Sequence, residues 1–200
     1  NNLRGLLDSL NLRKIHLIVH DWGGPIGLGT ALAKPEQLGR VVILNTAAFA
    51  DTVVPWRIRL CRAPVIGEWR VRGFNGFAWP ATWMSVTRPL TPDVKRGFIY
   101  PYNNWANRIA THRFVVDIPS GKGSASDRAL AEVESKLGLL RDHPVRILWG
   151  GQDFCFNRHY YKRWKVLLPG AHADYFEEAG HYVLEDAGQE CQREIQSFLG

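Results

Sequence analysis

Several features that would define other classes of protein are missing from this sequence. It has no apolar run long enough to span a membrane, no signal peptide, no internal repeat and no low-complexity tract. Its three cysteines, Cys61, Cys155 and Cys191, share no metal-ligand spacing, and an odd number argues against a disulfide framework. Reduced thiols suit the cytoplasm. We therefore expect a cytoplasmic globular protein without a metal site or a membrane span.

A starting methionine is also absent, and the chain opens within a stretch of helical apolar spacing, residues 3–12. From this opening we expect that an N-terminal part of the fold, with the first strands of its sheet, precedes the sequence given.

The net charge of +6 does not by itself indicate nucleic-acid binding, because most of the basic residues are scattered. The exception is segment 56–72, WRIRLCRAPVIGEWRVR, in which arginines alternate with apolar residues. We interpret this segment as a surface helix with a solvated basic face. The alternative is a docking face for a protein partner or a membrane surface. No nucleic-acid partner is expected.

The remaining pattern predicts an α/β fold with a mostly parallel sheet flanked by helices. Dense β-branched runs at 14–20 and 40–45 predict strands buried on both faces, separated by a helix over 26–37. No strand is evident from 47 to 140, a segment rich in aromatic residues, arginine and proline. Strands are again expected at 145–150 and 173–178, with helices over 158–167 and 188–199. We predict core residues 1–47, a helical cap with its return to the core over 48–140, and core residues 141–200.

Three of the predicted strands end in residues that can carry chemistry. Asp21, Asp153 and His181 each follow a strand. The carboxyl ends of parallel strands meet at one edge of a sheet, where ligands bind in open α/β folds. The chain order of a nucleophile, an acid and a histidine is that of the α/β-hydrolase triad. We expect these three side chains to converge.

The first of these turns, His20 to Gly24, fits a nucleophile elbow with aspartate in the place of serine. Gly23 would allow close packing of strand and helix, and the helix N-terminus would favour an ionised carboxylate. Taken alone, Asp21 could instead be a helix cap. His20 is expected to point away from the site and to pack. The glycines at 23–29 lack the G-x-G-x-x-G order, so no dinucleotide cofactor is expected.

The motifs VHDWGGPIG, WGGQDF and EAGHYVLED together resemble the haloalkane dehalogenase family of α/β-hydrolases. The similarity extends over nearly the whole chain. NWANRIATHRFVVDIP and WGGQDFCF are similar to the third subgroup of that family, which includes β-lactone decarboxylases of long-chain olefin biosynthesis.

The resemblance implies covalent catalysis without a cofactor. Asp21 would displace a halide to give an alkyl ester, and His181, oriented by Asp153, would activate the water that hydrolyses it. Trp22, with Trp79 or Trp83 from the cap, would donate hydrogen bonds to the halide or the oxyanion. Asp153 is preferred as the acid because the exit of the second strand, at Asn45, carries no carboxylate.

The substrate is expected to be small and apolar. We predict hydrolysis of carbon–halide bonds first. A β-lactone decarboxylase with the same triad, an epoxide hydrolase, and an inactive binding domain or fragment are the alternatives.

Overall fold

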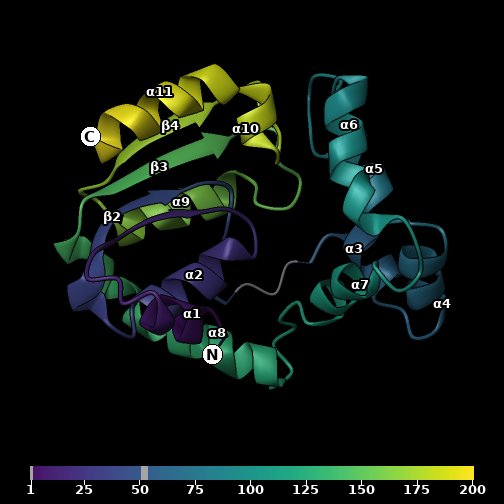
Figure 1. Cartoon of the computed structure of the whole chain (residues 1–200), viewed down its shortest axis with the longest axis horizontal. Helices are drawn as coiled ribbons and strands as arrows, with labels where there is room; N and C mark the ends of the chain where they lie inside the picture. The colour runs from purple at the N-terminus through teal and green to yellow at the C-terminus, as the bar shows by residue number, and fades with distance from the viewer. Residues whose placement is uncertain (1, 51–53) are drawn as a thin grey trace.

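The computed structural model describes residues 2–50 and 54–200. One part of the chain is a sheet with helices on both faces, and the other is a group of helices beyond the ends of the strands (Figure 1). Residues 51–53, which belong to the predicted cap segment, lie outside the described residues. None of the described helices has the length and apolar character needed to cross a bilayer.

The sheet has four parallel strands in the order β1-β2-β3-β4. Their bounds are Ile15–Val19 for β1, Leu38–Ile43 for β2, Val145–Gly150 for β3 and His172–Phe176 for β4. Because the strands run in the same direction, their carboxyl ends lie at one edge, and the arrowheads point toward the separate helices (Figure 1). The predicted mostly parallel sheet with flanking helices is confirmed.

Successive side chains of β2 and of the residue that follows it point to opposite faces of the sheet, so they contribute to two separate parts of the core. Val41 and Ile43 join a cluster with α2, α9 and the segment after α8, in which Trp149 and Trp164 are fully buried. Val42 and Leu44 join a second cluster against α10 and α11. A strand that is covered on both sides in this way reads as a continuous apolar run, which is why β2 was predictable.

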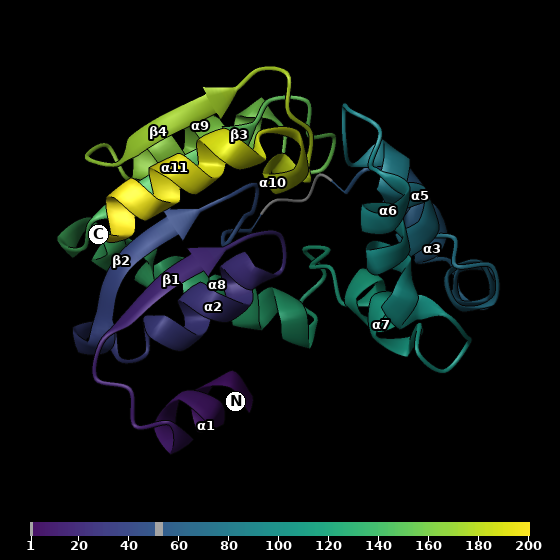
Figure 2. The ribbon, with the colours of Figure 1, turned by 45° about the horizontal axis from the view of Figure 1, so that its top comes forward.

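The helices that surround the sheet lie before β1, between the strands and at the C-terminal end of the chain (Figure 2). They are α1 (Asn2–Ser9), α2 (Gly23–Ala31), the 3₁₀ turn η1 (Pro35–Gln37), α8 (Ala125–Lys136), the 3₁₀ segment η4 (Leu137–Asp142), α9 (Arg158–Leu167), α10 (Val183–Asp186) and α11 (Gly188–Leu199).

The separate helices, which we call the helical layer, follow β2 in the chain and have a small core around Cys61, Val71 and Val115. They are α3 (Trp56–Cys61), α4 (Ile66–Glu68), the π-helical turn η2 (Trp69–Gly73), α5 (Ala78–Met84), α6 (Pro92–Ile99), the 3₁₀ turn η3 (Tyr100–Tyr102) and α7 (Ile109–Val116). Pro92 lies in the first turn of α6, where a missing N–H costs nothing, and Thr91 caps that helix.

One prediction for the sheet is wrong. β1 was expected to be buried on both faces, but its burial alternates, and the Ile18 side chain remains 46% exposed. Leu17 and Val19 pack into the cluster beneath α2, whereas the opposite face of this edge strand carries no helix among the described residues. A short β-branched run does not distinguish an edge strand from a central one, because the distinction depends on which helices cover it.

Candidate active site

Asp21 occupies a sharp turn between β1 and α2. Its φ of 49° lies in the left-handed region, which few residues other than glycine adopt and which aspartate and asparagine tolerate best. The Asp21 N–H donates to the Asn45 carbonyl over 3.0 Å, and the Thr46 hydroxyl donates to the Asp21 carbonyl. These contacts with the loop after β2 hold the turn in its conformation, and strain of this kind often accompanies functional sites.

The small residue required at this turn is Gly24 rather than Gly23, which corrects the prediction. A Cβ atom at Gly23 would meet nothing within 4 Å, whereas one at Gly24 would lie 2.0 Å from the Thr46 hydroxyl oxygen. Thr46 comes from the next strand exit, so the sequence around Asp21 alone could not indicate this contact. The close approach brings α2 against the loop that supports the Asp21 carbonyl.

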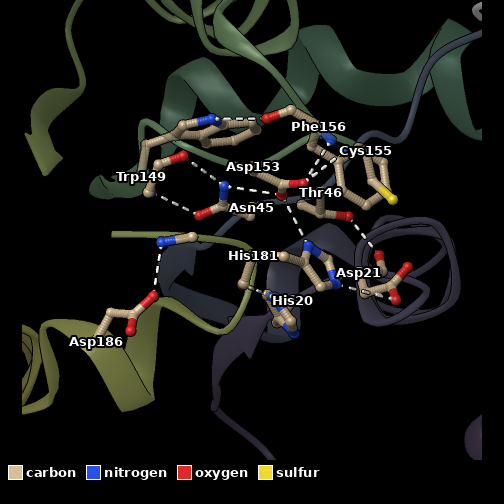
Figure 3. A network of polar contacts seen from close by, with 12 residues as sticks. His20, Asp21, Asn45, Thr46, Trp149, Asp153, Cys155, Phe156, His181 and Asp186 are labelled. Carbon is tan, nitrogen blue, oxygen red and sulfur yellow. Dashed lines mark hydrogen bonds and ion pairs between the residues drawn. The ribbon is translucent and has the colours of Figure 1, made fainter. Parts of the chain in front are cut away.

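The structure brings Asp21, Asp153 and His181 together at the carboxyl edge of the sheet (Figure 3). His181 Nδ1 lies 2.7 Å from Asp153 Oδ2, and His181 Nε2 lies 3.4 Å from Asp21 Oδ2. The side chains of Asp153 and His181 are 0% and 7% exposed, and that of Asp21 is 46% exposed. The imidazole thus bridges a buried carboxylate and one that is open to a ligand.

Charge in this cluster is set by burial and by the two carboxylates. Burial lowers the pKa of His181, but the charge and hydrogen bond of Asp153, together with those of Asp21, outweigh burial and raise it to about 10. Burial raises the pKa of Asp153, but the His181 charge and hydrogen bonds outweigh that effect and lower it. At neutral pH the resting cluster therefore contains an imidazolium beside ionised Asp153.

Asn45, in the loop after β2, supports Asp153, a role that the sequence did not reveal. Its side-chain Nδ2 donates to Asp153 Oδ2 and to the Gly150 carbonyl, each over 3.0 Å, and its Oδ1 accepts the Gly150 N–H over 2.8 Å. The backbone N–H groups of Cys155 and Phe156 donate to Asp153 Oδ1. Both oxygens of this buried carboxylate are thereby satisfied, which a buried charge requires.

Replacing Asn45 by aspartate should destabilise the fold by about 3 kcal/mol at neutral pH, because it places a second carboxylate against Asp153 and removes two donors. The new carboxyl group should have a raised folded-state pKa, so the loss relative to wild type should shrink as pH falls and the group protonates. Urea unfolding at several pH values measures both effects. The control is Asn104→Asp, an exposed site where the side-chain oxygen only accepts an N–H. Equal stability of the two variants would refute this role of Asn45.

His20 lies against His181, which differs from the predicted orientation away from the site. The two ring centroids are 4.5 Å apart, and His20 Nε2–H donates to the His181 carbonyl over 2.9 Å. Burial, and then the positive charge of His181, lower the pKa of His20. A neutral His20 can therefore pack beside the imidazolium and hold the backbone of the loop that carries it.

Asp186 ties the same loop to the helical layer, and its side chain was not singled out from the sequence. Its carboxylate accepts the N–H of Gly180 over 2.7 Å and those of Thr87 and Arg88 over 2.9 and 3.1 Å. The Tyr182 N–H also donates to the Ser85 carbonyl. The loop that carries His181 is therefore fixed to the segment that follows α5.

A large cavity of about 1370 Å³ lies between the strand ends and the helical layer, and Asp21, Trp22 and His181 line it. The volume exceeds the roughly 300–1,000 Å³ of most small-molecule sites. Much of the remaining lining is apolar and comes from both parts of the chain, including Phe49, Met84, Phe114, Ile118 and Phe156. Among the described residues, no group of His, Cys, Asp and Glu side chains is arranged to hold a metal ion.

Of the three tryptophans proposed as donors, the structure brings only Trp22 to this cavity, where its ring packs 5.4 Å from that of Phe114. Trp79 and Trp83 pack edge to face on each other and do not line the cavity. They are four residues apart on α5 and share one face, whereas Ala78, Ala81 and Met84 line the cavity. Their sequence positions did not specify which face of the helix turns inward.

A parallel sheet with an aspartate on a strained turn, a histidine and a buried acid defines an α/β-hydrolase arrangement. The model of the alpha/beta hydrolase family matches residues 2–193. The chain therefore belongs to this family.

Two curated relatives are similar over the whole chain. This chain is 41% identical to a cis-3-alkyl-4-alkyloxetan-2-one decarboxylase of Shewanella oneidensis, and the alignment covers 100% of this chain and 64% of the relative. It is 40% identical to the protein of the same name from Xanthomonas campestris, spanning 100% and 68%. Among solved structures, a variant of the haloalkane dehalogenase DatA from Agrobacterium tumefaciens superposes with a TM-score of 0.87 at 21% identity, covering 99% of this chain and 71% of that one.

Proposed function

We propose that this protein decarboxylates cis-3,4-dialkyl oxetan-2-ones, four-membered β-lactones, to alkenes. The observation that carries the proposal is the identity of 40–41% to two decarboxylases named for this substrate, combined with an aspartate that faces a large, mainly apolar cavity. The 25% identity to a haloalkane dehalogenase of Mycolicibacterium paratuberculosis gives weaker support for carbon–halide hydrolysis. We therefore propose lactone decarboxylation first and carbon–halide hydrolysis second, whereas the sequence motifs favoured the reverse order.

Asp21 would act as the nucleophile. Its carboxylate would attack, in line, the alkyl-bearing ring carbon bonded to the ring oxygen, break that carbon–oxygen bond and release ring strain. The product would be an ester of Asp21 that carries a free carboxylate on the neighbouring carbon. Loss of CO₂ would then leave its electron pair to form the double bond, and Asp21 would depart as the regenerated carboxylate. Inversion followed by anti departure converts the cis-lactone to a cis-alkene.

His181 would supply charge and orientation to this sequence. Its imidazolium, held by Asp153, faces the Asp21 oxygen at 3.4 Å and would stabilise the carboxylate that ring opening releases. No water enters the products, so a protonated His181 is compatible with every step. A halide substrate would differ, because the ester would have to be hydrolysed and His181 would have to act as a base.

The cavity would hold the two alkyl chains. We propose that the helical layer is the cap predicted within 48–140, since its residues close the cavity over Asp21. Phe114 and Met84 would contact the chains, and these side chains bury apolar surface without hydrogen-bonding demands.

The test is product analysis with a cis-lactone that carries two medium-length alkyl chains. We expect stoichiometric CO₂ and the cis-alkene, measured by gas chromatography and mass spectrometry, with no β-hydroxy acid. Formation of the hydroxy acid would mean hydrolysis instead, and intact lactone would remove the proposed function altogether.

Carbon–halide hydrolysis is the second candidate because Trp22 lies beside Asp21 on the cavity wall, where its indole N–H could donate to a leaving halide. Bromide release from a long-chain bromoalkane, run beside the lactone assay, separates the two. Faster turnover of the bromoalkane than of the lactone would favour this candidate.

A further inference from the structure

Several residues of the helical layer both line the cavity and are exposed to solvent. Trp56, Arg57, Leu60, Arg70 and Phe74 line the cavity and are also exposed to solvent, with Phe74 at 79% and Trp56 at 61%. We call these five residues the arginine–aromatic rim. The rim therefore exposes apolar and positively charged side chains on the part of the cavity wall that the helical layer supplies.

The turn that joins α3 to η2 extends this exposed surface. Val65, Ile66 and Trp69 are 70%, 64% and 60% exposed. Val65 has a φ of 63°, which is strained for a β-branched residue, yet its side chain is not packed into the core. This turn, with α4, lies at the end of the helical layer farthest from the sheet (Figures 1 and 2). Apolar residues gathered in this way on a surface indicate an interaction site, whereas scattered ones do not.

The net charge of this surface is positive. Residues 54–74 contain five arginines and one acidic residue, Glu68, and Glu68 forms an ion pair with Arg72. Arg57, Arg59 and Arg70 are exposed around the apolar side chains. Arginine and tryptophan are the side chains that settle at the headgroup level of a bilayer, with apolar neighbours inserted just below it. An anionic lipid bilayer would complement both the positive charge and the exposed apolar side chains of this surface.

We propose that the arginine–aromatic rim and the turn around Val65 dock this protein on an anionic lipid bilayer, so that an apolar substrate enters the cavity from the lipid. Docking depends on this surface and not on the reaction. If docking is not observed, the proposed function therefore still stands. The entry route rests on the proposed function, because long alkyl chains partition into lipid.

Vesicle co-sedimentation tests the docking. The protein is mixed with vesicles of phosphatidylcholine alone and of equal parts phosphatidylcholine and phosphatidylglycerol. We expect at least about tenfold tighter binding to the anionic vesicles, weakening as salt is raised. Val65→Glu and Arg59→Glu should each weaken that binding at least about fivefold. Neither residue lines the cavity, so turnover of a short, water-soluble substrate should be unchanged.

The matched controls are Val166→Glu, on α9 at 79% exposure, and Arg193→Glu, exposed on α11. They make the same changes on the sheet part of the molecule and should bind vesicles as wild type does. Absence of binding to either vesicle, or equal losses in the control variants, would overturn the proposal. A surface that instead binds an acidic protein would give the first of these results.

Discussion

Replacing Asp21 by asparagine is expected to lower kcat at least about 10⁴-fold, as the loss of a covalent nucleophile does in other hydrolases. Asparagine has almost the same shape and tolerates the left-handed φ of 49° at this turn, so the fold should persist. The amide cannot form the proposed ester. Steady-state turnover of the lactone, with thermal unfolding as the check on folding, measures the effect.

The control for this substitution is Asp93→Asn, an exposed aspartate on α6 whose side chain is 82% exposed. It should keep wild-type kcat. Mass spectrometry must also show that the introduced amide has not deamidated to aspartate. A folded, amide-containing variant that keeps more than about a hundredth of the wild-type kcat would rule out Asp21 as the nucleophile.

Replacing His181 by glutamine should reduce kcat about 10²–10⁴-fold, because it removes the cation between Asp21 and the buried Asp153. It should also destabilise the fold by about 3 kcal/mol at neutral pH, since Asp153 would keep only its amide donors. His181 has a folded-state pKa raised from 6.5 to about 10, so its stabilising contribution is complete below pH 6.5 and is lost as pH rises toward 10.

The difference in unfolding free energy between wild type and His181→Gln should therefore shrink from pH 6.5 to pH 10, as measured by urea unfolding across that range. His172→Gln is the control, because His172 is an exposed histidine whose Nδ1 lies 3.6 Å from Asp174 Oδ2. A difference that stays constant with pH would show that His181 is not protonated beside Asp153.

The sheet and the approach of Asp21, Asp153 and His181 could be predicted because each depends on local sequence. Apolar β-branched runs mark parallel strands, and residues that directly follow such strands share one edge of the sheet whatever the details of packing. The bounds of α9 and α11 were predicted for a similar reason, since apolar periodicity and polar ends define those helices.

The supporting contacts could not be predicted, because they join segments that are distant in the chain. Asn45 contacts Asp153 across 108 positions, and Asp186 accepts from Thr87 across 99. A single asparagine or aspartate in a loop carries no sign of its partner. The sequence could likewise not show that Trp79 and Trp83 lie outside the cavity lining, since which face of α5 turns to the cavity depends on how the whole helical layer packs.

The motifs do not specify the substrate. A carboxylate nucleophile with a histidine and an acid suits ring opening of a lactone and displacement of a halide alike, so the motifs around Asp21 and His181 do not separate them. The cavity that would separate them is assembled from residues between positions 4 and 182 of the chain.

The central claim is that Asp21 becomes covalently attached to the lactone. The direct measurement is rapid-quench mass spectrometry of the peptide that contains Asp21 during turnover with the cis-lactone. We predict a transient adduct on Asp21 with the full mass of the lactone, which disappears as alkene and CO₂ form. Turnover with no adduct on Asp21 at any quench time, or an adduct on a different residue, would contradict the account.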